Sequence, residues 1–373
     1  MKNVRRLAGR GGSFPPPVLH HPLIRRCYRR NFRFSRPEDG LRRRQSHAIC
    51  ESGIFSGLLR RGQVSAASQR RLEQAPAQTR AMHRGVRRGN LDDISVTRIN
   101  GLIGAEIGNV DMSKDINDRT IEQITKALAE NGVIFFRDQD LSADRQRAFA
   151  RRFALPGAKR APVADAQITM IEKEEQQLKN VGGGWHADQT FNEVPSWGSI
   201  LAAKVLPSAG GDTVFASLAA AYDDLSEGMK TQLETMRAEH NNERVITSMS
   251  LLPQYAGAKA KVVKATHPVV IRHPITGRKS LFVNRGYTTH FEGWTQEESA
   301  PLLQYLFQKC ERPEYQVRLK WRPGTVAFWD NLQVLHYAVN DYHGERRVMQ
   351  RVSVSGIRLD RAGCTAAACV SQP

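Results

Sequence analysis

The chain has 373 residues, 40% of them hydrophobic, which is enough for one sizeable core or two modest ones. No apolar run approaches the roughly 18 to 20 residues that span a bilayer, so a transmembrane protein is not expected. The five cysteines are scattered and form no Cys-x-x-Cys pair, which argues against a disulfide framework or a zinc ribbon. This cysteine pattern favours a reducing compartment, and we expect a cytoplasmic protein.

The formal net charge of +18 is concentrated at one end of the chain. Residues 1–90 contain 21 of the 55 Lys and Arg residues and only four acidic residues, whereas the remainder is close to neutral. The body therefore gives no indication of a nucleic-acid surface. Residues 1–90 also show no sustained periodicity, so we expect a disordered, arginine-rich tail. Three explanations of this tail stay open: an organelle-targeting segment, a nucleic-acid-binding arm, or a translation start at Met82.

Alternating strands and helices are predicted in the first part of the body. Strands are expected over 94–99, near 104–107 and over 133–136. One helix is expected to be capped by Asp118 and to end near Gly132. A second is expected to be capped by Ser142 and to run through Phe153. We expect a single domain over 91–360 and a disordered C-terminal tail over 361–373.

Short strands dominate the chain after residue 160. They are predicted over 168–171, 200–205, 213–216, 269–272, 280–283, 316–321, 326–329 and 348–354. Helical stretches interrupt them over 218–236 and 296–310, and 274–277 is expected to form a hairpin turn. The pattern is typical of a mixed α+β, β-rich domain.

Two metal-ligand residue types stand close together in Trp185-His186-Ala187-Asp188. In a strand, residues i and i+2 point to the same side, so one strand could direct an imidazole and a carboxylate at one point. His336, 150 residues later, could complete the set. Two histidines and one carboxylate suit Fe(II) that also binds a co-substrate and O2. By itself a His-x-Asp is more often a surface turn or a hydrogen-bonded pair.

The segment after His336 predicts a strand with two different faces. One face carries Val348, Gln350, Val352 and Val354, and the other carries Arg347, Met349 and Arg351. One interpretation is an exposed edge strand with solvated cations. The other is a strand that lines a cavity, where a guanidinium requires an anion and its planar fork suits a carboxylate.

Taken in order, these motifs resemble the taurine dioxygenase (TauD/TfdA) family of Fe(II)- and 2-oxoglutarate-dependent dioxygenases, which also includes aryloxyalkanoate dioxygenases. The resemblance covers roughly residues 95–357. Its other motifs are Pro207 to Thr213, with its Gly210-Gly211 turn, His267 to Val270, Leu281 to Asn284, and Trp329 to Asn331. The resemblance implies a double-stranded β-helix (jelly roll) core with flanking and inserted helices.

The resemblance also implies roles for individual residues. His186, Asp188 and His336 correspond to the iron ligands, and Thr213 and Arg347 to the ligands of the distal carboxylate of 2-oxoglutarate. Arg351, Gln189 and Phe191 are expected at the substrate, and Trp329 and Asn331 are expected to orient the metal ligands. The glycines 182–184 are expected to form a lid or a close backbone approach beside the metal. O2 is the second co-substrate, and a homo-oligomer without nucleic-acid or membrane partners is expected.

The implied reaction is hydroxylation of a small anionic substrate. The family's taurine enzyme has a sulfonate-binding histidine, and residues 153–160 here contain none, so taurine itself is not indicated. A sulfonate, a sulfate ester or an aryloxyalkanoate is expected, with C–S or C–O cleavage after hydroxylation. Two alternatives remain: an inactive jelly-roll binding protein, and a nucleic-acid-associated oxygenase that uses the basic tail.

Overall fold

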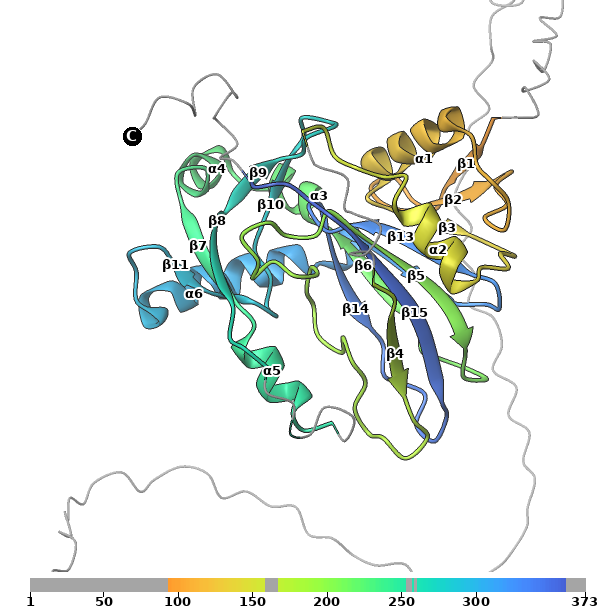
Figure 1. The fold of residues 1–373 in the computed structure, drawn as a ribbon. Helices are drawn as coiled ribbons and strands as arrows, with labels where there is room; N and C mark the ends of the chain where they lie inside the picture. Colours follow the sequence, from red (N-terminus) through yellow and green to blue (C-terminus); the bar gives the residue numbers. More distant parts are fainter. Residues whose placement is uncertain (1–92, 158–166, 253–256, 258–259, 360–373) are drawn as a thin grey trace, which may run out of the picture. The chain divides into compact units, whose positions relative to one another are not determined.

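A computed structural model describes residues 93–157, 167–252, 257 and 260–359, and the predicted tails over 1–90 and 361–373 lie outside these residues. A seven-stranded sheet forms the largest layer (Figure 1). Its strand order is β1 (Ser95–Arg98), β2 (Ala105–Gly108), β3 (Val133–Phe136), β13 (Val326–Asp330), β5 (Gly198–Val205), β15 (Arg347–Val354) and β4 (Thr169–Lys173). All neighbours pair antiparallel except β2 and β3, which are parallel.

The strand that carries the two arginines lies inside this sheet. β15 pairs with β5 on one side and with β4 on the other, with Arg347 opposite Lys173 and Arg351 opposite Leu201. Arg347 and Met349 are buried on one face, and Val352 and Val354 are buried on the other. The edge-strand interpretation is therefore wrong, because both sides of β15 are hydrogen-bonded.

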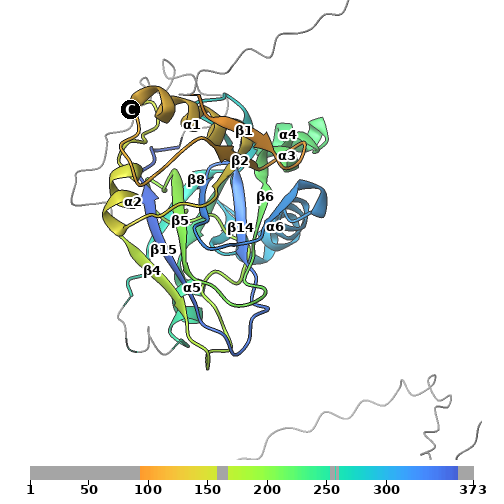
Figure 2. The ribbon, with the colours of Figure 1, turned by 90° about the vertical axis from the view of Figure 1, so that its right-hand side faces the viewer.

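A smaller sheet faces the large one. It consists of β12 (Gln316–Leu319), β6 (Thr213–Ser217) and β14 (Val334–Ala338), and Figures 1 and 2 show β6 and β14 beside β5 and β15. One apolar cluster joins the two sheets, with Phe135, Leu201 and Met349 from the large sheet and Phe215 and Leu319 from the small one. These facing sheets form the predicted jelly roll.

The other face of the large sheet is covered by α1 (Asp118–Asn131) and α2 (Ala143–Ala150). The cap of α1 was predicted one residue late, because Asn117 accepts the hydrogen bond from the Thr120 backbone N–H. Ser142 caps α2 as predicted. However, this helix ends at Ala150, and the chain then turns so that Phe153 packs edge-on against Phe328 of β13 at 5.0 Å.

The predicted helix over 218–236 is instead two helices, α3 (Leu218–Asp223) and α4 (Glu227–Leu233), because Ser226 caps a new helix. The predicted helix over 296–310 is confirmed as α6 (Gln296–Cys310), which begins with a capping box between Thr295 and Glu298. The turn over 274–277 is also confirmed, between β9 (Val270–Arg272) and β10 (Lys279–Leu281).

Four further elements had no clear sequence pattern. These are α5 (Glu243–Met249) and a second three-stranded sheet made of β11 (Thr288–Phe291), β7 (Arg237–Asn241) and β8 (Lys264–Pro268). Their polar side chains obscure the alternation, although Ala238 and His240 of β7 are both buried. Within the described ranges no helix has the length and apolar character needed to cross a membrane.

Candidate metal centre and anion site

His186, Asp188 and His336 come together between the two facing sheets. Their ligand atoms lie within 4.8 Å of one another, and among the described residues this is the one His, Cys, Asp and Glu group suited to a metal ion. Asp188 Oδ1 is 3.6 Å from His186 Nε2 and 3.7 Å from His336 Nε2. The two imidazole centroids are 4.1 Å apart. All three side chains thus present a lone pair toward one point.

The loop that carries His186 and Asp188 is not the regular strand that was predicted. His186 forms an isolated β-bridge with His336, with N···O distances of 3.1 and 2.8 Å. Asp188 follows in a turn. The glycines were predicted to form either a lid or a close backbone approach. At Gly182, which has a φ of +82° and accepts a hydrogen bond from the Ala338 N–H, a Cβ would lie 3.5 Å from His186 Cε1.

Asp188 is held by contacts on both of its oxygens. Oδ2 accepts a hydrogen bond from Ser199 Oγ at 2.6 Å, and Arg351 Nη1 donates to Oδ1 at 3.3 Å. Burial would raise the pKa of the Asp188 carboxyl, but the Arg351 charge, the two imidazoles and the Ser199 hydroxyl lower that pKa well below its usual value. The carboxylate therefore stays ionised at neutral pH.

Both imidazoles are suited to act as neutral ligands. His186 Nδ1 donates to the Gly184 carbonyl at 2.7 Å, a tautomer that leaves the lone pair on Nε2. Burial, followed by the neighbouring His186 imidazole, lowers the pKa of His336 to about 3. Protons therefore do not compete for the His336 lone pair at neutral pH.

The segment before His336 orients this site. Asn331 Oδ1 accepts hydrogen bonds from the Asp188 backbone N–H at 3.1 Å and from Trp329 Nε1 at 2.9 Å. The preceding Asp330 is fully buried and accepts from Trp197 Nε1 and His273 Nε2, both at 2.8 Å. The sequence indicated Trp329 and Asn331, but His273 carried no sign of a link to the site.

Arg347 is a second residue of interest, because its buried guanidinium is suited to bind an anion. Its side chain is buried, and its Nε and Nη2 have no hydrogen-bond partner within the described part of the chain. Burial lowers the pKa of the Arg347 guanidinium. The Trp321 ring lies 5.9 Å from Arg347 Cζ and donates its Nε1–H to Thr213 Oγ1 at 3.0 Å. The structure therefore brings Thr213 and Arg347 together through Trp321, which the sequence reasoning missed.

The turn before Thr213 is shaped around Arg347. Gly210 and Gly211 have φ values of +78° and +68°, which confirms the tight turn predicted here. A Cβ on Gly211 would lie 3.2 Å from Arg347 Cδ. Glycine at this position therefore leaves room for the arginine.

Gln189 and Phe191 lie near the metal ligands. Gln189 has a φ of +56° and accepts a hydrogen bond from Ser196. Phe191 packs edge-on against Tyr287 at 5.0 Å, and the Tyr287 ring lies 6.2 Å from His186. Tyr287 was not singled out in the sequence.

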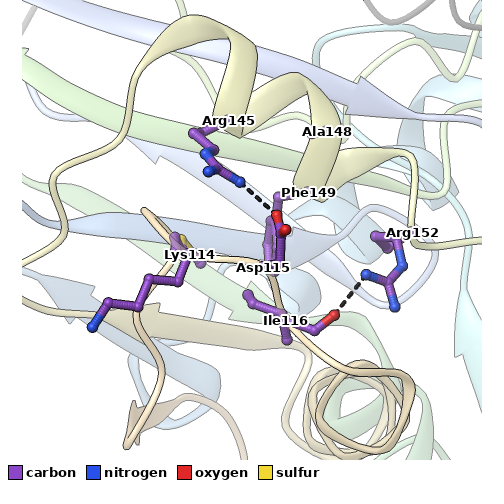
Figure 3. A pocket seen from close by; sticks show the side chains of 8 residues that line it. Lys114, Asp115, Ile116, Arg145, Ala148, Phe149 and Arg152 are labelled. Atoms are coloured by element: carbon purple, nitrogen blue, oxygen red, sulfur yellow. Dashed lines mark hydrogen bonds and ion pairs between the residues drawn. The ribbon is translucent and has the colours of Figure 1, made fainter.

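A pocket lies elsewhere, between the 112–116 segment and α2 (Figure 3). Arg145 of α2 and Arg152, which follows the helix, extend toward the segment and contact Asp115 and the Ile116 carbonyl, respectively, each at 2.6 Å. None of the predicted site residues lines this pocket, and its polar groups are already paired.

Comparison with known proteins places these features in context. Residues 95–353 match the family model described as "Taurine catabolism dioxygenase TauD, TfdA family". The chain is 36% identical over 272 residues to an alkylsulfatase of Acinetobacter baylyi, covering 70% of this chain and 85% of that protein. It is 36% identical over 275 residues to an alpha-ketoglutarate-dependent sulfate ester dioxygenase of Pseudomonas putida, covering 71% and 90%. A solved taurine dioxygenase from Burkholderia xenovorans is similar at a TM-score of 0.57 and 30% identity, covering 70% of this chain and 89% of that one.

Proposed function

Because the chain belongs to the taurine catabolism dioxygenase TauD, TfdA family, we propose that it is an Fe(II)- and 2-oxoglutarate-dependent dioxygenase that hydroxylates a small anionic substrate. The observation that carries this proposal is the convergence of His186, Asp188 and His336 within 4.8 Å. Three ligands on one side of an octahedral ion leave three positions for other groups. Bound Fe(II), with 2-oxoglutarate and O2, supplies the oxidising chemistry.

The protein's part at the metal is to fix the ligands before the ion binds. His186 and His336 offer Nε2, and Asp188 offers Oδ1. Ser199 and Asn331 hold the carboxylate and its backbone, so little reorganisation is needed on binding. Asp188 is the anion that offsets part of the charge of the metal.

Arg347 and Thr213 are proposed to bind the distal carboxylate of 2-oxoglutarate. Arg347 has Nε and Nη2 free to donate in parallel, which matches the two oxygens of a carboxylate. Thr213 Oγ1 already accepts from Trp321, so its own O–H remains available as a donor. A carboxylate here would satisfy buried donors that have no partner among the residues that the structure describes.

Arg351 is proposed to bind the anionic group of the substrate. It lies four residues beyond Arg347 on β15, which corresponds to roughly 13 Å along a strand, so the two arginines serve different anions. Its Nη1 is 3.3 Å from Asp188 Oδ1, and its side chain is 22% exposed. An anion held here would lie beside the metal, with Gln189 and Phe191 against the organic part of the substrate.

Sulfate esters are the substrate class that we favour, because two relatives at 36% identity are named for alkyl sulfate or sulfate ester chemistry. One oxygen atom of O2 would enter the carbon that carries the sulfate, and the other would enter succinate as 2-oxoglutarate loses CO2. In the hydroxylated product the bond between that carbon and the ester oxygen of the sulfate breaks. Its electron pair leaves with sulfate, and the new hydroxyl loses its proton to become an aldehyde. A sulfonate would break its C–S bond in the same way.

A panel of four substrates, three of which share one hexyl chain, tests this proposal. The purified full chain with Fe(II), 2-oxoglutarate and O2 would receive hexyl sulfate, hexanesulfonate, phenoxyacetate or the neutral hexanol. We expect equal amounts of sulfate and succinate from hexyl sulfate and no hexanol oxidation. Equal turnover of hexanol would contradict an anionic substrate. Absence of 2-oxoglutarate-dependent turnover with every compound would favour the inactive binding protein.

A further inference from the structure

Lys173, at the end of β4, is a buried lysine without an acidic partner. Its side chain is 2% exposed. Nζ donates one hydrogen bond, to the Tyr342 carbonyl at 3.3 Å, and lies 4.4 Å from the centroid of the Tyr342 ring. No acidic side chain of the described ranges forms an ion pair with it. Lysines are almost never fully buried unless they are paired, because removing the ammonium from water is costly.

A second buried cation stands directly opposite. In the antiparallel register of β4 and β15, Lys173 is the partner of Arg347. Directly opposite residues have Cβ atoms roughly 5 Å apart, and like charges at such positions destabilise a sheet. The Tyr342 ring lies near both, with its centroid 6.0 Å from Arg347 Cζ. The two cations therefore share one region of the interior.

Two carboxylates that act electrostatically on Arg347 or Tyr342, those of Asp212 and Asp341, already have other partners. Asp212 accepts from Arg318 Nε at 2.6 Å. Asp341 accepts from the Gly211 N–H at 2.7 Å and from Arg318 at 3.4 Å. Among the described residues, neither acid forms an ion pair with Lys173 or Arg347. Within the described part of the chain, neither Lys173 nor Arg347 thus has a protein anion within ion-pair distance.

We propose that Lys173 is a second cationic determinant of the site that binds the distal carboxylate of 2-oxoglutarate, acting beside Arg347. The inference rests on the proposed function and adds to it the residue that selects a 2-oxo acid with a second carboxylate. Arg347 would make the two directed hydrogen bonds to the carboxylate. Lys173, beside Tyr342, would attract the carboxylate as a point charge. Binding the carboxylate would bring an anion to both cations, which a 2-oxo acid without a distal charge could not do.

Binding affinity for two 2-oxo acids tests this inference without turnover. Calorimetric titration of the Mn(II)-loaded full chain would compare 2-oxoglutarate with 2-oxopentanoate, which has the same length and no distal carboxylate. We expect Lys173→Met to weaken 2-oxoglutarate binding about tenfold, from Coulomb attraction at a moderate effective dielectric. Binding of 2-oxopentanoate should change less than about twofold, because it carries no charge for Lys173 to attract. Lys173→Arg should retain most of the affinity.

Lys204→Met is the matched control, because Lys204 also donates to a backbone carbonyl, that of Leu141, from a strand of the same sheet. It should leave both affinities unchanged. Thermal unfolding without ligand should show no loss of stability in Lys173→Met, since an unpaired buried cation is removed.

Three results would overturn the inference. Unchanged 2-oxoglutarate affinity in Lys173→Met, together with lost affinity in Arg347→Leu, would exclude Lys173 and leave the proposed function standing. Equal weakening of both 2-oxo acids would mean that Lys173 supports the fold and not the carboxylate. Failure of the wild-type protein to bind either compound would overturn the proposed function itself, and this inference with it.

Discussion

Replacing Arg347 by leucine tests the anion site most directly. The arginine is 5% exposed, and its Nε and Nη2 have no partner among the described residues. Removing one partner of a desolvated charged pair costs about 2 to 5 kcal/mol. Since about 1.4 kcal/mol corresponds to a factor of ten, 2-oxoglutarate should bind about 30-fold to 4000-fold more weakly. The affinity of Arg347→Lys for 2-oxoglutarate should lie between those of wild type and Arg347→Leu, because lysine keeps the charge and loses the bidentate fork.

The assay separates binding from folding. The affinity of the Mn(II)-loaded protein for 2-oxoglutarate is measured by calorimetry, and the stability of the ligand-free protein by thermal unfolding. Leucine replaces a buried cation that has no ion-pair partner among the described residues, so the ligand-free variant should be at least as stable as wild type. Wild-type affinity in Arg347→Leu would refute the assignment. A large loss of ligand-free stability would refute the claim that the guanidinium is unsatisfied without its anion.

Four further changes test separate parts of the structure. Ser199→Ala removes the hydrogen bond to Asp188 Oδ2 and should weaken Mn(II) binding about 10-fold or more, whereas unchanged metal affinity would show that the contact is dispensable. Gly211→Ala places a Cβ 3.2 Å from Arg347 Cδ at a φ of +68°, so it should weaken 2-oxoglutarate binding about 10-fold while metal affinity stays constant. Burial lowers the pKa of His240 well below its ordinary value, whereas an unfolded histidine titrates near pH 6.5. The unfolded state therefore gains protons that the folded state does not as pH falls below about 6.5. His240 should make the free energy of unfolding drop by up to about 1.4 kcal/mol per pH unit, and His240→Gln should lack this component in urea unfolding at pH 5 to 7. Deletion of residues 1–81 should leave turnover intact, and its loss would point to the nucleic-acid-associated alternative.

Local pattern determined a large part of this protein. Alternation along 347–354 predicted two distinct faces of β15, and the structure buries Arg347 and Met349 on one face and Val352 and Val354 on the other. Thr295 and Glu298, three residues apart, form the capping box that begins α6, and Ser142 caps α2. These features depend on residues within one turn of helix or a few residues of strand. Their geometry therefore follows from backbone periodicity alone.

Chemical type likewise indicated the metal set, because His186, Asp188 and His336 are the side chains that Fe(II) prefers. The predicted strand at 186–188 was wrong, since the loop is shaped by a bridge to His336, a contact 150 residues away. Spacing along the chain could therefore not specify how the three side chains converge.

Tertiary structure alone decided which charged residues lose water. Nothing in the sequence distinguishes Lys173 from an exposed lysine, whereas in the fold it is buried opposite Arg347 and beside the Tyr342 ring. The contact of His273 with Asp330 likewise joins a hairpin to the segment before the metal site, 57 residues apart. Burial and strand partners arise from contacts between distant segments, and a buried charge acquires a function because the protein leaves it without a partner.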